Sequence, residues 1–200
     1  MTWLAIIAAL IWLYFYMKAV GATFSAWGFV AFVLSRERIA DWLVVRAMKT
    51  PYSHIYKDGE IYMGRFWLFN PYAPDASGKE VSKYPWIPFN IRIHRIHRED
   101  RDEHLHDHPW NARTIILRGG YTEVREEYNG FLIHSQLKQY EISRYTGCTA
   151  KLTFGEYHKI KSVFPEGATT LFISGRYQGT WGFMVNGFKV KWRTYLGLEK

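Results

Sequence analysis

Cysteine is almost absent from this chain of 200 residues, and charge is almost absent from its first part. Cys148 is the only cysteine, which excludes an internal disulfide framework and any zinc site built from several thiolates. A metal site in this chain must therefore use histidine and carboxylate ligands. Residues 2–34 carry one charged side chain, Lys18, whereas the mean hydropathy of the whole chain is only −0.23. An apolar N-terminal segment thus precedes a polar remainder.

The sequence also lacks the glycine-rich loops of nucleotide-binding proteins, the nucleophile elbow of hydrolases and any internal repeat. The net charge is +8, from 26 Lys+Arg and 18 Asp+Glu, and it suits an anionic lipid surface, a nucleic acid or an acidic substrate. Aromatic residues make up 18% of the chain, but many of them lie in the apolar N-terminal segment and in strand-like runs. Nucleic acid is therefore the least favoured of these partners.

Two apolar runs of 16 residues, 2–17 and 19–34, flank Lys18. A helix that spans a bilayer needs about 20 apolar residues, so each run is marginal and both together are too long for one upright span. The sequence leaves open a helical hairpin that turns near Lys18 and Gly21, and a single span with the remainder at the interface. An aromatic cluster typical of a headgroup boundary precedes Lys18: Trp12, Tyr14, Phe15 and Tyr16.

We predict that this segment is a retained membrane anchor. The alternatives are a cleaved signal peptide and a buried helical pair. No basic residues precede the apolar run, and the chain stays apolar for a dozen residues beyond the small-residue stretch 20–22. Both features disfavour a signal peptide.

Residues 35–50 predict a basic amphipathic helix, with Ser35 as a good N-cap and Pro51 as a good stop. Such a helix could lie on the cytoplasmic membrane surface or pack on the following domain. We therefore predict an anchor over 1–50 and a β-domain over 51–200 on the cytoplasmic side. The apolar side of the helix would hold Ile39, Trp42, Leu43 and Met48, and its positive charge comes from Arg36, Arg38, Arg46 and Lys49.

From residue 52 onward, short apolar runs alternate with turn signals. Glycine-containing turns recur at 58–59, 119–120, 129–130, 146–147, 165–167 and 186–187, and the runs between them are rich in β-branched and aromatic residues. Ile91 and Ile93 alternate with Arg92 and His94, which is the period of a strand with two different faces. The pattern predicts a mainly β domain, either a sandwich or a small barrel.

Five of the eight histidines fall between positions 94 and 108. His104, His106 and His108 alternate, so in an extended segment all three can face one cavity, with Asp107 on the opposite side. Two imidazoles from one strand and a third from elsewhere can hold a transition metal with open positions. This arrangement favours a metal site over a solvated polar loop.

These residues resemble the metal motif of the cupin superfamily, and the similarity extends to small bacterial and phage cupin-like proteins. The resemblance implies a mainly β fold, the double-stranded β-helix, a jelly-roll-like barrel. It also implies one divalent metal ion held by His106, His108 and His158. The segments that carry the resemblance are His106-Asp-His108-Pro-Trp110, Gly119-Gly120-Tyr-Thr-Glu123 and Gly155-Glu-Tyr-His158, within residues 52–197.

One position departs from the cupin pattern. Cupins place a glutamate ligand between the histidine pair and the glycines, but residues 111–114 here read Asn-Ala-Arg-Thr. Glu123 could replace that ligand, and His104 could replace His108 because the spacing is the same. Two further histidines, His94 and His97, could lie behind the ligands or face a substrate. The remaining two are expected to be structural or exposed: His54 and His134.

The resemblance implies a metal-dependent enzyme of the oxygenase or isomerase type, and Fe(II), Mn(II), Ni(II) and Zn(II) all suit histidine ligands. Arginines in such a cavity would bind a carboxylate or phosphate through paired hydrogen bonds, which predicts a small anionic substrate. The alternative is a non-catalytic binding or assembly module, with a structural metal or none, since the expected glutamate is missing. A homodimer is compatible with either. The arginines considered for the substrate are Arg92, Arg113, Arg118 and Arg176.

Overall fold

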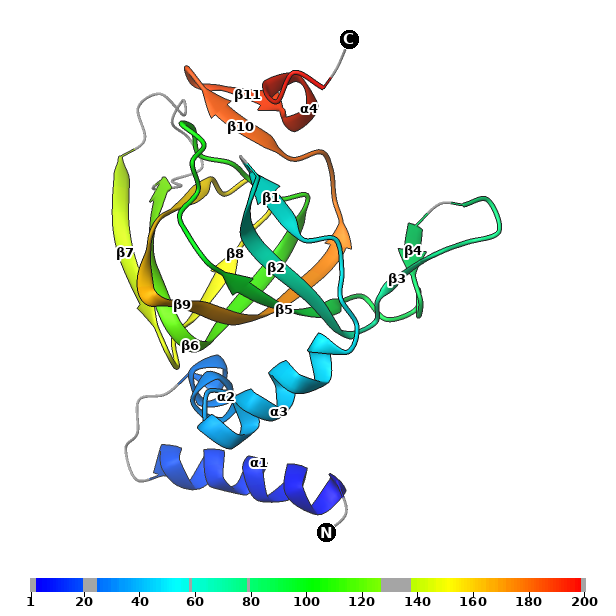
Figure 1. Ribbon diagram of the computed structural model, residues 1–200. Helices are drawn as coiled ribbons and strands as arrows, with labels where there is room; N and C mark the ends of the chain where they lie inside the picture. The colour runs from blue at the N-terminus through cyan, green and yellow to red at the C-terminus, as the bar shows by residue number, and fades with distance from the viewer. Residues whose placement is uncertain (1–2, 20–24, 58, 79, 127–137, 199–200) are drawn as a thin grey trace.

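The computed structural model describes residues 3–19, 25–57, 59–78, 80–126 and 138–198. Figure 1 shows a curled β-structure with the N-terminal helices gathered at one end. The helices are α1 (Trp3–Ala19), α2 (Ala26–Leu34), α3 (Glu37–Met48) and α4 (Trp192–Tyr195). The strands are β1 (Ile55–Lys57), β2 (Glu60–Phe69), β3 (Tyr72–Pro74), β4 (Glu80–Ser82), β5 (Asn90–Ile96), β6 (Trp110–Glu126), β7 (Gln139–Tyr145), β8 (Thr149–Leu152), β9 (His158–Tyr177), β10 (Gly182–Val185) and β11 (Phe188–Lys191). The prediction of a mainly β domain is confirmed.

The main sheet is antiparallel and has the order β1-β2-β5-β9-β6-β7, with β8 also paired to β6. The two longest strands, β6 and β9, pair over most of their lengths, and a bulge follows Gly119. A Cβ atom on Gly119 would lie 1.9 Å from the carbonyl oxygen of Gly167, and the φ angle of Gly119 is +62°. Glycine is the residue that permits both this backbone and this close approach. The glycines predicted to form a turn thus lie inside β6, where its pairing with β9 shifts register.

The strands β5, β6 and β9 have opposite chemistry on their two faces, because successive side chains point to opposite sides of a strand. The outer face packs against α2 and α3, and the inner face lines a cavity. The outer face carries Ile93, Ile115, Leu117 and Leu171. The inner face carries Arg92, His94, Thr114, Thr170 and Phe172. The alternation of Ile91 and Ile93 with Arg92 and His94 in the sequence therefore separates residues that face the core from residues that face the cavity.

α3 packs on the outer face of the sheet through a narrow stripe. Ala40, Leu43 and Ala47 are buried there, because residues spaced by three and four share one side of a helix. Trp42 and Met48, which we expected on the same apolar side, are instead 58% and 47% exposed. The sequence left open whether this helix lies on a membrane surface or packs on the following domain, and in the structure it packs on the domain. Its outward side carries the exposed basic residues Arg36, Arg38, Arg46 and Lys49.

α1 lies beyond α2 and α3, on the side away from the β-structure (Figure 1). Its Tyr14 ring contacts the Phe29 ring of α2, with the two centroids 5.5 Å apart. Trp12 and Phe15 remain 67% and 64% exposed. One side of α1 therefore covers α2, and other sides present large apolar residues outward.

The apolar N-terminal stretch is divided between two helices, α1 with 17 residues and α2 with nine. In the described part of the chain, no helix combines the length and the apolar character needed to cross a membrane. The spanning helix predicted from the sequence is therefore not found there. The predicted turn near Gly21 lies outside the described residues.

Candidate metal centre

The segment between β5 and β6 brings two histidines to the start of β9. His106 N–H donates to His158 O over 3.0 Å, and His158 N–H donates to His106 O over 2.9 Å, so the segment pairs with β9 like a short strand. Asp107 points to the other side, where it accepts a hydrogen bond from Gly182 N–H at 2.7 Å. The alternation predicted for 106–108 therefore exists, although no long strand supports it.

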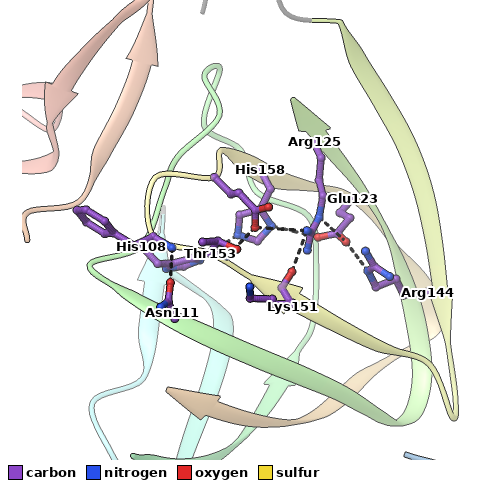
Figure 2. Close-up of polar contacts among 10 residues, drawn as sticks. His108, Asn111, Glu123, Arg125, Arg144, Lys151, Thr153 and His158 are labelled. Carbon is purple, nitrogen blue, oxygen red and sulfur yellow. Dashed lines mark hydrogen bonds and ion pairs between the residues drawn. The ribbon is translucent and has the colours of Figure 1, made fainter. Parts of the chain in front are cut away.

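These pairings bring His106, His108 and His158 together. Each offers a ring nitrogen, and the three atoms lie within 4.8 Å of one another. His108 Nε2 and His158 Nε2 are 2.9 Å apart (both residues are labelled in Figure 2). Two nitrogens bound at right angles to one ion at about 2.0–2.1 Å would be about 2.9 Å apart. The spacing of these two rings thus fits two neighbouring ligands of one metal ion.

Burial favours the neutral form of two of these imidazoles. It lowers the pKa of His106, an effect that Asp100 opposes and His158 reinforces. Burial also lowers the pKa of His108 well below its usual range, and charge on His158 and His106 adds to that effect. Neutral imidazole is the form that ligates a metal, so these side chains need not lose a proton at neutral pH. The Nδ1 atom of His106 is buried and has no hydrogen-bond partner among the described residues.

Glu123 lies behind His158 rather than beside the ligand nitrogens (Figure 2). Its Oε2 atom is 3.1 Å from His158 Nδ1, while Oε1 accepts from Arg125 Nε at 3.0 Å and also from Arg144. A carboxylate at Nδ1 fixes the ring proton there and leaves the Nε2 lone pair directed at His108. The interpretation of Glu123 as a direct ligand is therefore corrected, because its carboxylate reaches the far side of the His158 ring.

The charge of Glu123 is well compensated. Burial by itself would raise the pKa of this carboxyl, which is 1% exposed. The hydrogen bond from His158 and the electrostatic interaction with that ring, together with the positive charges of Arg125 and Arg144, outweigh burial and lower the pKa of Glu123 to about 2. The carboxylate is therefore ionised wherever the protein is folded near neutral pH.

His104 does not join the cluster. The chain bends at Glu103 and His104, so the regular alternation begins only at the next residues, and His104 Nδ1 instead lies 3.1 Å from the Tyr195 hydroxyl. The alternative in which His104 takes the place of His108 as a metal ligand is therefore not found. That alternative required extended backbone at His104, and the structure has a bend there.

The other histidines outside the cluster have separate environments. His54 Nδ1 accepts a hydrogen bond from Arg65 N–H over 3.0 Å, which is a structural role. His97 is exposed, and His134 lies outside the described residues. His94 differs from all three, because it lines the cavity.

The cavity has a volume of about 240 Å³ and contains the three-histidine cluster. His94 forms part of its wall, stacked on Phe172 with the ring centroids 4.7 Å apart. Burial lowers the pKa of His94 well below its usual range, with Arg92 and Arg65 adding to the effect. The Nε2 atom of this neutral ring is buried and has no partner among the described residues.

Of the four arginines considered for the substrate, only Arg92 lines this cavity. Arg65, which no sequence pattern indicated, also lines the cavity and alternates with the cavity residue Met63 on β2. The remaining arginines lie elsewhere: Arg113 hydrogen-bonds Thr149, Arg118 pairs with Asp41, and Arg176 is exposed.

No protein-family model matches the chain, and no curated protein matches it. Among solved structures, Fe(II)-HppE with an alternative substrate is 12% identical, with a TM-score of 0.42 over 65% of this chain and 57% of that one. Bacillus subtilis oxalate decarboxylase is 11% identical, with a TM-score of 0.46 over 77% and 33%. Streptomyces albus HEPD with 2-hydroxyethylphosphonate and Fe(II) bound is 13% identical, with a TM-score of 0.43 over 66% and 25%. The chain thus spans at most 57% of the length of these proteins, and similarity of this degree establishes no activity for it.

Proposed function

We propose that this chain is a cupin-like protein in which His106, His108 and His158 hold one divalent transition metal ion. The observation that carries the proposal is the 2.9 Å separation of the Nε2 atoms of His108 and His158, with His106 in the same cluster. A curled antiparallel sheet around the site is compatible with a double-stranded β-helix. Fe(II), Mn(II), Ni(II) and Zn(II) all accept imidazole ligands.

We further infer that the site belongs to a metal-dependent enzyme of the oxygenase or isomerase type. The three imidazoles would leave coordination positions of a divalent ion open, and such an ion would supply polarisation of a substrate oxygen or a lowered pKa of a water. Glu123 would hold the proton of His158 on Nδ1, and the aromatic walls formed by Trp110, Phe172 and Trp181 limit water in the cavity. The substrate must be small enough for a cavity of about 240 Å³.

A non-catalytic binding module with a structural metal is the second candidate. Among the described residues that line the cavity, Asp100 is the only carboxylate. Its Oδ2 atom already accepts a hydrogen bond from Ile160 N–H over 2.9 Å. With one carboxylate in the described lining of the cavity, and that one already engaged with the backbone, the site offers few acidic groups for proton transfer, and this observation favours binding without turnover.

Metal content is the direct test of the proposed function. The full chain, purified without a polyhistidine tag and loaded with Mn(II) or Zn(II), is expected to retain one ion per chain after dialysis. His106→Ala and His158→Ala should each abolish stoichiometric metal, whereas His54→Ala, which alters a histidine outside the cluster, should not. If both cluster variants keep one tightly bound ion, the assignment of this site is wrong.

Glu123→Gln separates a supporting role from a ligand role. Loss of a hydrogen-bond partner behind a ligating histidine weakens metal affinity by roughly 10–100-fold, while the number of bound ions stays the same. The measurement is a competition titration with a coloured chelator. Unchanged affinity would show that the contact to His158 does not support the metal.

We also propose that α1 contacts an anionic membrane surface. Leu4, Trp12 and Phe15 are 78%, 67% and 64% exposed, and the same layer of helices carries the exposed basic residues of α3. Apolar side chains beside basic ones suit the interface of a bilayer that contains acidic lipids. The full chain is therefore expected to sediment with phosphatidylglycerol vesicles and less with phosphatidylcholine vesicles.

The matched variants for this test are two exposed tryptophans. Trp12→Glu on α1 should weaken vesicle binding, whereas Trp86→Glu, which replaces a 72% exposed tryptophan between β4 and β5, should not. Equal loss in both variants would remove α1 as the contact. A homodimer that buries α1 would overturn the proposal as well, and it would appear as dissociation of the dimer by Trp12→Glu in sedimentation velocity runs without lipid.

A further inference from the structure

Arg92 is a buried cation in the wall of the cavity. It lies on β5, and its side chain is 5% exposed. Three aromatic rings surround its guanidinium, whose Cζ atom lies 5.2 Å from the ring centroid of Trp67, 5.7 Å from that of Trp110 and 5.4 Å from that of Phe172. Aromatic faces stabilise a cation only in part, so this charge is held where water has little access.

No carboxylate among the described residues neutralises Arg92. Its one hydrogen bond there runs from Nη2 to Ser174 Oγ over 2.9 Å, and its Nε atom is buried without a partner in the same part of the chain. Burial lowers the pKa of Arg92 to about 10, with Tyr72 opposing this and Arg65 adding to it, so the group is charged at neutral pH. A buried charge without a counter-charge costs stability, and a cation of this kind is expected only where something else compensates it.

The same cavity holds the three-histidine cluster. Phe172 contacts the guanidinium of Arg92 and also lies against His108, with the two ring centroids 6.4 Å apart. His94 stacks on the same Phe172 ring, and its Nε2 atom has no partner among the described residues. One small cavity thus presents a cluster that could hold a metal, together with a guanidinium and an imidazole nitrogen that the described part of the chain leaves without a counter-charge and without a hydrogen bond, respectively.

We propose that Arg92 binds the oxyanion group of a small organic acid whose other end faces the three-histidine cluster. This inference rests on the proposed function and specifies its substrate class. The unpartnered Nε–H of Arg92 donates to a carboxylate or phosphonate oxygen in the charge-assisted geometry that guanidinium groups favour. His94 offers Nε2 to a second polar atom of the same molecule. The aromatic walls accept the short apolar part between the two ends.

The other arginines supply a matched control. Arg176 lies on β9 and is exposed, so Arg176→Gln removes the same formal charge from the chain without changing the cavity. Arg92→Lys keeps the charge and loses the planar fork. Arg92→Met keeps much of the volume and removes the charge.

The experiment measures the melting temperature and the tryptophan fluorescence of the full chain, both metal-free and loaded with Zn(II). The probes are propionate, malonate, methylphosphonate and the neutral analogue propionamide. An anion at a hundredfold excess over its Kd should raise Tm by about 5–10 °C, whereas propionamide should not raise it. Arg176→Gln should respond like the wild type, Arg92→Lys should bind at least tenfold more weakly, and Arg92→Met should not respond. The carboxylate and phosphonate arms show which oxyanion is preferred.

Without any ligand, Arg92→Met should melt no lower than the wild type, because it removes a buried charge that no carboxylate among the described residues neutralises. A lower Tm together with unchanged anion binding would assign Arg92 a purely structural role and overturn the inference. Equal anion binding by the wild type and Arg92→Met, or a response to propionamide alone, would overturn it too. If anions act through Arg92 while no metal binds, the proposed function fails and the anion site stands. If metal binds and no anion does, the anion site is wrong and the proposed metal site stands.

Discussion

The two faces of the sheet formed by β5, β9 and β6 consist of alternate residues of the same strands, yet one face packs against helices and the other lines a cavity. On the outer face, Ile93, Ile115 and Leu171 are at most 4% exposed and pack with apolar residues of α2 and α3. On the inner face, the neighbouring Arg92 and His94 are nearly as buried, but each carries a nitrogen without a partner among the described residues. Burial of apolar area stabilises the fold, whereas unsatisfied buried polar groups oppose it. One face thus holds the fold together, and the other keeps polar groups available for a ligand.

The largest effect should come from uncovering the outer face. Deletion of residues 1–50 removes α3 and α2, which cover Ile93, Ile115, Leu117 and Leu171, so the remaining β-structure is expected to be insoluble or unfolded. Deletion of residues 1–24 removes only α1 and should leave the far-ultraviolet circular dichroism of the β-structure intact. Cooperative unfolding of residues 51–200 on their own would show that the helices are dispensable to the fold.

A single truncation on the outer face comes next. Leu171→Ala removes a 4% exposed side chain from the layer between β9 and the helices. Large-to-small changes at such positions lower the free energy of unfolding by about 2–5 kcal/mol. Urea titration of the metal-free chain gives this value.

The inner-face counterpart of that variant is His94→Leu. It replaces a buried neutral ring whose Nε2 atom has no partner among the described residues, and so it should leave the free energy of unfolding unchanged or raise it. If His94→Leu destabilises the chain as much as Leu171→Ala does, the two faces contribute alike and the contrast between them is wrong.

Acid should lower the free energy of unfolding by protonating Glu123, which lies behind the cluster residue His158. The pKa of Glu123 is about 2 in the folded chain, against an ordinary value of 4.5. A lowered carboxyl pKa contributes stability that is complete above pH 4.5 and is lost as the pH falls toward 2. Glu123→Gln should therefore lower the free energy of unfolding of the metal-free chain by on the order of 3 kcal/mol at pH 7.

The difference between wild type and Glu123→Gln should then shrink between pH 4.5 and pH 2, where the wild-type carboxylate takes up a proton. Urea titrations of both chains at pH 7, 4 and 3 measure it. A difference that stays constant with pH would mean that the charge of Glu123 does not contribute, and that its contacts to Arg125 and Arg144 act only through packing.

Local patterns predicted the parts of the site that depend on local geometry. The alternation at 106–108 indicated that His106 and His108 share one side, and the alternation at 91–94 indicated the two faces of β5. The resemblance to cupins, rather than a local pattern, added His158, and the same alternation wrongly included His104. The role of Glu123 could not be read in this way, because it depends on which side of the His158 ring the carboxylate reaches once β6 pairs with β9. The same limit applied to the arginines, since one candidate in four lines the cavity and no local pattern distinguishes it.

For the N-terminal segment, the composition was plainly apolar, but the sequence did not indicate what the apolar residues contact. The apolar character of residues 2–34 suits a bilayer and a protein core equally, because both exclude water. The three residues of α3 that meet the sheet, Ala40, Leu43 and Ala47, are less hydrophobic as a set than Trp42, Val45 and Met48 on its exposed sides. Hydrophobicity alone therefore placed Leu43 and Ile39 correctly against the core but also assigned the exposed Trp42 and Met48 to that side. The packing of the sheet decides which side of the helix is buried.

The smallest effect is expected at the border between the helices and the sheet, where Arg118 of β6 pairs with Asp41 of α3. Both side chains are largely accessible to water, at 41% and 58% exposure, so solvent and salt screen their attraction. A double-mutant cycle with Arg118→Gln and Asp41→Asn should give a coupling free energy below about 1 kcal/mol, smaller still in 0.5 M salt. Since the outer face is held by apolar contact, this pair should orient α3 without contributing much to its attachment. A coupling several times larger, insensitive to salt, would show that an ion pair anchors α3, and the contrast between an apolar outer face and a polar inner one would need to be redrawn.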